Sequence, residues 1–221
     1  MWHKIIHNKG WSWYAAKTPW WLMWYYKKLI WRIPTKEKII YLTFDDGPIP
    51  KVTEYVLATL AQYKVKASFF CIGKNVVDNP TIYQKIIDKK HSVGNHTYNH
   101  LNGWKTPTTN YLQNINEASN VIHSNWYRPP YGRITKKQIK ALLQLNAPIK
   151  IIMWDVLSGD FDTTITPEKC YRNVINNVQA GSIIVFHDSE KAYERLLIAL
   201  PKCIEWLLSN GYTFKTLDEW Y

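Results

Sequence analysis

The stretch KIIYLTFDDGP, residues 38–48, joins an apolar run to two adjacent carboxylates and a turn. Residues 38–44 are typical of a buried strand, and Gly47-Pro48 predicts a turn where that strand ends. Asp45 and Asp46 therefore stand at the carboxyl end of the strand. An Asp-Asp-Gly-Pro string on its own is more often a turn than a functional site, so its meaning depends on the rest of the chain.

A second fragment, HTYNH at residues 96–100, places His96 and His100 four residues apart. We expect a helical turn here, because that spacing then puts both imidazoles on one face, where they can bind one cation. Two imidazoles and one carboxylate are a common ligand set for a catalytic divalent metal that keeps a position open for water or substrate. The other carboxylate is then free to act as a base. For the histidine pair alone, a solvated helix face is the competing interpretation.

Strand-like and helix-like stretches alternate after residue 38. The strand-like stretches are 38–44, 66–72, 91–95, 125–128, 149–155, 182–188 and 212–214. The helix-like stretches are 52–63, 81–90, 111–124, 135–145, 166–179 and 191–210. Pro201 predicts an interruption or a bend in the last helix. This alternation predicts parallel strands joined by crossover helices, with polar residues at the carboxyl ends of the strands, where parallel barrels build their sites.

Three more fragments complete a constellation: RPPYG at 128–132, WDVLSGDFD at 154–162 and IIVFHD at 183–188. In order and spacing, the five fragments resemble the motifs of the polysaccharide deacetylase family, also called the NodB-homology domain or carbohydrate esterase family four. The resemblance covers roughly residues 38–217. It implies an α/β fold, an irregular (β/α)7 barrel of mostly parallel strands, and a metal-dependent hydrolase that removes acetyl groups.

The resemblance assigns the metal site and the base. Asp45 matches the catalytic base, and the metal ligands are Asp46, His96 and His100. One divalent ion is implied. Zinc suits two imidazoles and a carboxylate, although cobalt and nickel share that preference.

The resemblance also assigns the remaining catalytic groups. Arg128 matches the arginine that pairs with the base, and the backbone N–H of Tyr131 matches an oxyanion donor. His187 matches the general acid, which an amide nitrogen needs in order to leave, and Asp160 matches the carboxylate that orients it. Phe161 departs from the pattern, because the family usually has Trp there. Asp155, Asp162 and Asp188 are interpreted as turn or cap residues.

The first 38 residues differ in composition from the rest of the chain. They carry eight lysines and arginines against Glu37 alone, which accounts for seven of the eleven net positive charges, and seven of the twelve tryptophans. We therefore divide the chain into a basic, Trp-rich segment, 1–37, and a catalytic domain, 38–221. Residues 1–33 suit either contact with a membrane or another anionic surface, or a cap packed over the barrel, and we favour the cap.

Composition and motifs also limit which binding partners and which cellular location we expect. The chain has 221 residues, enough for one sizeable domain, and no helix-turn-helix, zinc-finger or RNP signature, so we expect no nucleic-acid partner. Neither a signal peptide nor a bilayer-spanning stretch is recognised, and Cys71, Cys170 and Cys203 form no C-x-x-C pair. A cytoplasmic or peripheral membrane location is therefore slightly favoured. The oligomeric state is left unknown.

The sequence predicts a de-N-acetylase acting on an N-acetylated glycan, such as a GlcNAc-containing chito-oligosaccharide or peptidoglycan. One alternative is an O-acetyl esterase on acetylated sugars such as xylan, since esters are easier substrates than amides. Another is a non-catalytic surface-binding protein on the same fold. The complete set of site residues argues against the latter.

Overall fold

The computed structural model describes residues 2–7, 10–145 and 149–220. Its main sheet has eight strands in the order β7-β6-β5-β4-β3-β9-β8, with β10 paired to β3, and every pair in it is parallel. The strands are β3 (Ile39–Asp45), β4 (Ser68–Cys71), β5 (Ser92–Asn95), β6 (Trp126–Tyr127), β7 (Lys150–Ile151), β8 (Val156–Leu157), β9 (Ile183–His187) and β10 (Thr213–Phe214). The predicted class, an irregular barrel of parallel strands, is confirmed.

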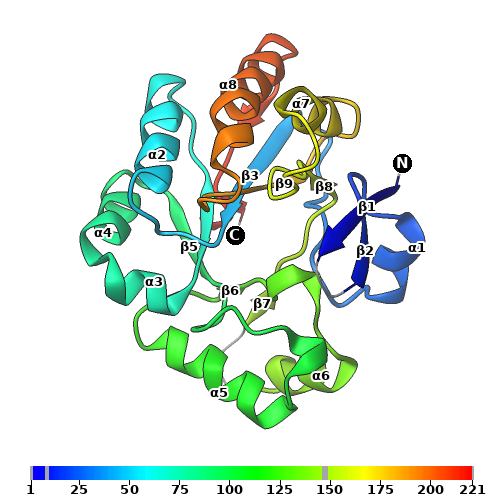
Figure 1. The fold of residues 1–221 in the computed structure, drawn as a ribbon, viewed down its shortest axis with the longest axis vertical. Coiled ribbons are helices and arrows are strands. Elements are labelled where there is room, and N and C mark those ends of the chain that lie inside the picture. The colour runs from blue at the N-terminus through cyan, green and yellow to red at the C-terminus, as the bar shows by residue number, and fades with distance from the viewer. Residues whose placement is uncertain (1, 8–9, 146–148, 221) are drawn as a thin grey trace.

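Helices surround the strands (Figure 1). They are α2 (Val52–Gln62), α3 (Gly73–Asp78), α4 (Pro80–Asp88), α5 (Thr108–Ser119), α6 (Lys136–Leu143), α7 (Pro167–Ile175) and α8 (Tyr193–Ser209). Pro201 lies inside α8 without interrupting it. All seven residues of β3 are buried, as expected for a parallel strand covered on both faces. No helix among the described residues is long and apolar enough to cross a membrane.

The core lies between the strands and the outer helices. The rings of Phe44 and Phe69, on neighbouring strands, stack with centroids 5.1 Å apart, and Phe186 of β9 packs beside Phe44. Cys71, Cys170 and Cys203 are buried free thiols. This packing fixes the strands whose ends carry the polar side chains.

The N-terminal segment forms structure that the sequence did not predict. Strands β1 (Trp2–His7) and β2 (Gly10–Ala15) make an antiparallel hairpin, followed by the short helix α1 (Trp20–Tyr25). Met1, Asn8 and Lys9 of the predicted 1–37 segment lie outside the described residues. The boundary at residue 37 stays a prediction.

Beyond the hairpin, the N-terminal segment runs between β7 and β8, the two ends of the sheet path. The amide of Ile30 donates to the carbonyl of Ile151 at 2.9 Å, and the amide of Leu157 donates to the carbonyl of Ala16 at 2.9 Å. Residues 149–155 therefore make only the two-residue strand β7, because the chain beyond it bonds to Ile30 instead. Backbone from residues 16–33 thus closes the barrel beside the site.

Candidate active site

The carboxyl ends of four strands of the main sheet, β3, β9, β6 and β5, bring the polar residues together. Asp45 ends β3 and lies in register with His187, which ends β9. Arg128 follows β6, and His96 follows β5. A cavity of about 410 Å³ opens at this edge, lined among others by Asp45, Asp46, His96, His100, Tyr131 and His187. Arg128 and Asp160 lie behind it, fully buried.

Asp45 and Arg128 form a buried ion pair. Arg128 Nη1 donates to Asp45 Oδ1 at 2.6 Å and to Thr43 Oγ1 at 2.8 Å. The other donors of the guanidinium reach the carbonyls of Ile152 and Met153, and its carbon atom lies 4.0 Å from the Phe70 ring centroid. Burial lowers the pKa of Arg128, and the charge of Asp45 opposes that change. The fixed guanidinium pairs with the Asp45 carboxylate and holds its rotamer.

Asp46, His96 and His100 face one another. Their ligand atoms all lie within 4.8 Å, with Asp46 Oδ1 at 3.2 Å from His100 Nε2 and 3.7 Å from His96 Nε2. Asp46 Oδ1 is buried, and no group among the described residues makes a well-formed hydrogen bond with it. Burial would raise the pKa of Asp46, but the imidazoles of His100 and His96 and the charge of His187 lower it well below its usual value. A buried acceptor without a donor, facing two imidazole nitrogens, fits a divalent cation.

His96 is held in the tautomer that a metal ligand needs. Its Nδ1 lies 2.8 Å from the carbonyl oxygen of Arg128, which can only accept, so Nδ1 carries the proton and Nε2 presents a lone pair towards Asp46. Burial lowers the pKa of His96 to about 4. The ring is therefore neutral near pH 7, as metal binding requires.

The expected helical turn at residues 96–100 is wrong. These residues form a loop in which Thr97 and His100 have φ of 65° and 56°, outside the right-handed helical region. The side chain of Asn95 accepts a hydrogen bond from the amide of Thr97, and Thr97 Oγ1 accepts one from the amide of Leu101. Side-chain hydrogen bonds, not helical periodicity, bring His96 and His100 together.

His187 and Asp160 form the second polar pair. Asp160 Oδ1 lies 2.8 Å from His187 Nδ1, and Asp160 Oδ2 accepts from the amide of His187 at 2.7 Å. Burial alone would lower the pKa of His187, but the charge and hydrogen bond of Asp160 outweigh it and raise the pKa to about 9. His187 is thus protonated near pH 7 and able to donate. Buried Arg195 supports the pair, because its Nε donates to the carbonyl of Asp160 at 2.5 Å.

Asp188, interpreted from sequence as a turn residue, anchors the loop that carries Asp46. Its two carboxylate oxygens accept from the amide of Gly47 at 3.0 Å and from Thr53 Oγ1 at 2.6 Å. A Cβ at Gly47 would lie 1.9 Å from Asp188 Oδ2, so the close approach requires glycine there. Burial raises the pKa of Asp188 to about 7.

Several wall residues were not singled out from the sequence. Tyr14, Trp154 and Leu157 line the cavity together with the expected Phe161. The phenol of Tyr14 donates to Asp162 Oδ2 at 2.9 Å, and its ring packs 5.2 Å from that of Phe161. Phe161 in turn meets the His187 ring edge to face at 5.0 Å. Trp154 was predicted as part of the strand at 149–155, but no local sequence feature indicated that its indole borders the cavity.

Comparison with known proteins identifies a family with this fold. The family profile described as "Polysaccharide deacetylase" matches residues 32–149. A peptidoglycan-N-acetylglucosamine deacetylase of Bacillus cereus is 32% identical over 86% of this chain and 91% of its own length. The peptidoglycan-N-acetylmuramic acid deacetylase PdaA of Bacillus subtilis is 31% identical over 84% of this chain and 72% of its own. A crystal structure of a peptidoglycan N-acetylglucosamine deacetylase superposes with a TM-score of 0.82 at 30% identity, over 92% of this chain and 97% of that one.

Proposed function

The chain belongs to the polysaccharide deacetylase family, and from that premise we propose that it removes the N-acetyl group from N-acetylglucosamine units of a peptidoglycan-type glycan. It is a hydrolase of carbon–nitrogen bonds other than peptide bonds. One observation supports the proposal above the others. The Asp45–Arg128 pair and the His187–Asp160 pair present a carboxylate and a protonated imidazole to a single cavity that is also lined by Asp46, His96 and His100.

In this proposal Asp45 is the general base. Its carboxylate accepts a proton from the attacking water, and the guanidinium of Arg128 holds that carboxylate in place. Arg128 is fully buried and its position is fixed by four acceptors, so Asp45 needs little rearrangement. The backbone N–H of Tyr131, a residue with φ of 60° on the cavity wall, is proposed to stabilise the developing oxyanion.

His187 is proposed as the general acid. It gives its proton to the sugar nitrogen as the carbon–nitrogen bond breaks, so that amide and water become amine and acetate. Asp160 fixes the ring through Nδ1, which leaves Nε2–H to point to the leaving nitrogen. The raised pKa of His187, about 9, keeps this proton in place through the neutral range.

Asp46, His96 and His100 would hold one divalent ion, and we propose zinc. When bound, such an ion polarises the acetyl carbonyl and lowers the pKa of its water. The neutral imidazole of His96 and the ionised carboxylate of Asp46 are the protonation states that zinc requires.

The test is acetate release by the zinc-loaded protein from three substrates: N-acetylglucosamine oligomers, isolated peptidoglycan and acetylated xylan. We expect release from the first two and little from xylan. Release from xylan alone would favour the O-acetyl esterase. Release from none of them, with zinc bound in equal amount to protein, would favour a non-catalytic protein on this fold.

A further inference from the structure

Four large aromatic side chains are exposed together on the short helix α1. Trp20, Trp21, Trp24 and Tyr25 are 77%, 52%, 73% and 53% exposed. Residues four apart lie on one side of a helix, so these four rings form one continuous surface, the outward face of α1. Soluble proteins seldom leave so many large rings in water at one place without a binding role.

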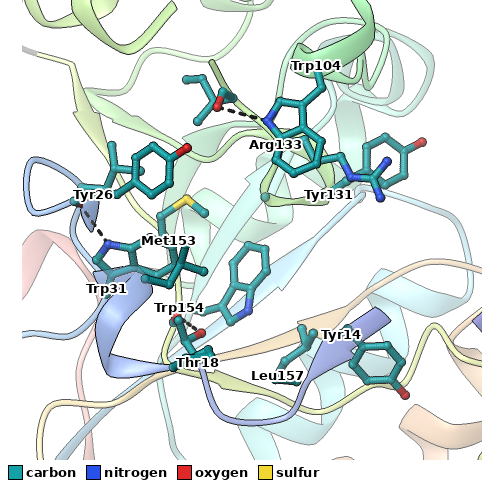
Figure 2. Close-up of a pocket in the computed structure, with 16 residues that line it drawn as sticks. Tyr14, Thr18, Tyr26, Trp31, Trp104, Tyr131, Arg133, Met153, Trp154 and Leu157 are labelled. Atoms are coloured by element: carbon teal, nitrogen blue, oxygen red, sulfur yellow. Dashed lines mark hydrogen bonds between the residues drawn. The ribbon is translucent and has the colours of Figure 1, made fainter. Parts of the chain in front are cut away.

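The other side of α1 packs on the barrel. Leu22 and Met23 contact the buried cluster that contains Met153. Tyr26, just after the helix, lines a cavity of about 320 Å³ together with Leu22 and Trp154 (Figure 2). The helix therefore already has a buried side, and the rings of the outward face are not needed for its packing.

The chain on both sides of α1 is tied to the barrel. Before the helix, the amide of Thr18 donates to the carbonyl of Asp155 at 2.9 Å, and the hydroxyl of Thr18 donates to the carbonyl of Trp154 at 2.8 Å. After it, the carbonyl of Ile30 accepts from the amide of Met153 at 2.7 Å. Because both flanks are held, the outward face of α1 has a fixed place on the surface.

The indole donors of the outward face differ from those of buried tryptophans. The indole N–H of Trp31 donates to a backbone carbonyl at 3.2 Å, and that of Trp126 donates to a carboxylate at 2.6 Å. Among the described residues, no acceptor takes the indole N–H of Trp20, Trp21 or Trp24. An apolar ring with an available donor suits the headgroup region of a bilayer, where the ring meets acyl chains and the N–H meets lipid oxygens.

Positive charge is concentrated in the part of the chain that carries this face. Residues 1–36 and 118–154 contain thirteen of the 28 lysines and arginines and none of the 17 aspartates and glutamates. The rest of the chain therefore has a small excess of acid. The two basic stretches lie side by side, because the amide of Ile30 donates to the carbonyl of Ile151. Together they give one side of the molecule a strong positive potential.

Lysines border the outward face of α1 directly. Lys27 and Lys28 follow the helix and are exposed. Lys136 begins α6 with its Nζ 4.0 Å from the ring centroid of Tyr25, and the exposed Lys140 lies one turn further along α6. Within the described part of the chain, no carboxylate forms an ion pair with any of these four lysines. Their charges are available to anions outside the chain.

The combination of rings and lysines favours a lipid surface over other partners. A neutral polymer offers the lysines no opposite charge. A second copy of the chain, docked face to face, would bring two sets of lysines together, and like charges oppose that contact. An anionic bilayer provides phosphate groups for the lysines and an apolar boundary for the rings.

We infer that the outward face of α1 binds the surface of an anionic lipid bilayer. The rings of Trp20 and Trp24 enter the headgroup region, and Lys27 and Lys28 contact the anionic headgroups. The cavity beside α1 shares Trp154 with the catalytic cavity, so the bound protein holds its catalytic cavity close to the bilayer. This inference goes beyond the proposed function and does not depend on it.

The first measurement is co-sedimentation of the whole chain with vesicles of phosphatidylglycerol and phosphatidylcholine, compared with vesicles of phosphatidylcholine alone. We expect at least tenfold higher affinity for the anionic vesicles. That affinity should fall as salt is added, because ions screen the lysines from the lipids.

Two double variants separate the rings from the charges. Trp20→Ala/Trp24→Ala should lower the affinity for anionic vesicles at least tenfold, a loss of about 1.4 kcal/mol, while the dependence on salt remains. Lys27→Gln/Lys28→Gln should also lower the affinity at least tenfold at low salt. In this second variant the dependence on salt should become weaker, because two of the charges that the lipids attract are gone.

Each control removes the same kind of group elsewhere on the surface. Ile198 and Leu208 are 48% and 40% exposed on α8, and Lys89 and Lys90 are exposed where α4 ends. Both helices lie away from α1 (Figure 1). Ile198→Ala/Leu208→Ala and Lys89→Gln/Lys90→Gln should bind within twofold of the natural sequence. Melting temperatures of all four variants identify any loss of folding.

Three results would overturn the inference: unchanged binding by Trp20→Ala/Trp24→Ala, equal losses in the test and control variants, or equal binding to both kinds of vesicle. A dimer that the tryptophan variant makes monomeric, without any binding to vesicles, would assign the face to a second copy of the chain instead. Retention on insoluble peptidoglycan but on no vesicle would assign it to the glycan. None of these results depends on acetate release, so the proposed function is tested separately.

Discussion

The carboxyl ends of the strands and the N-terminal segment place their residues in opposite ways. At the strand ends, charged groups such as Arg128 and Asp160 are fully buried and each is paired. On α1, large apolar rings such as Trp20 and Trp24 are left in water. Burying a charged group costs free energy. Leaving an apolar ring exposed loses the stabilisation that its burial would provide. Neither placement is what stability alone would select, so the contrast marks two surfaces that act on something outside the chain.

The N-terminal segment is itself divided. Leu29, Trp31 and Ile33 are buried against the barrel and close it between β7 and β8, whereas the rings of α1 face outwards. The cap and the anionic-surface contact, weighed as alternatives from composition, therefore concern different residues of one segment. The following predictions test each side of this comparison.

The largest effect is expected at the base. Asp45→Asn leaves the three proposed metal ligands in place and removes only the carboxylate proposed to take the proton, so kcat should fall roughly 10²–10⁴-fold. Acetate release measures the loss, and elemental analysis should find zinc unchanged. Asp78→Asn, a surface carboxylate paired with Lys74, is the control and should have normal activity. Near-normal turnover by Asp45→Asn would show that the base has been misassigned.

The next effect concerns the buried half of the N-terminal segment. Trp31 is 7% exposed and its indole bonds to the carbonyl of Tyr26, so Trp31→Ala should lower the free energy of unfolding by about 3–5 kcal/mol. Urea denaturation measures it. A change below about 1 kcal/mol would mean that the segment packs on the barrel without stabilising it.

The third prediction concerns pH. The pKa of His187 is raised from 6.5 to about 9, so its contribution to stability is complete below pH 6.5 and is lost as the pH rises through about 9. Asp160→Asn removes the charge that raises this pKa. The alkaline limb of the rate profile should therefore move to lower pH, and the stability of the variant should vary less between pH 6.5 and 9. An alkaline limb that stays in place would assign it to another group.

Sequence reasoning located the site because its signals are local. An apolar run leads directly to Asp45, and another ends at His187. Each run predicts a strand, and it also predicts that the polar side chain lies at the carboxyl end of that strand. The histidine pair was found by spacing, but the reason given for it was wrong. Four-residue spacing is equally compatible with a loop, and the bonds that shape this loop come from Asn95 and from Asn114, which lies in the following helix.

The residues that were missed depend on distant partners. Asp188 accepts from Gly47 and Thr53, more than 130 positions earlier, so nothing in its own surroundings indicated an anchor. Arg195 looked like one more basic residue of α8, yet it supports Asp160. The hairpin and α1 were missed because aromatic, basic and small residues are intermixed in this segment, and the segment as a whole shows neither a clear period of two nor one of 3.6.

The smallest effect is expected on the outward face of α1. Trp21 is 52% exposed, and no described hydrogen bond uses its side chain, so Trp21→Ala should change the free energy of unfolding by no more than about 0.5 kcal/mol. Trp31→Ala is the same substitution ten residues along the chain. Comparing the two variants therefore shows how much of the stability change comes from burial of the side chain, because the residue type removed is identical. Equal losses at the two positions would mean that the outward rings stabilise the fold, and the case for a binding role of α1 would fall with that result. A large loss of unfolding free energy in Trp31→Ala, with almost none in Trp21→Ala, would show that the exposed rings do not stabilise the fold. That result is the one expected if they bind an external surface.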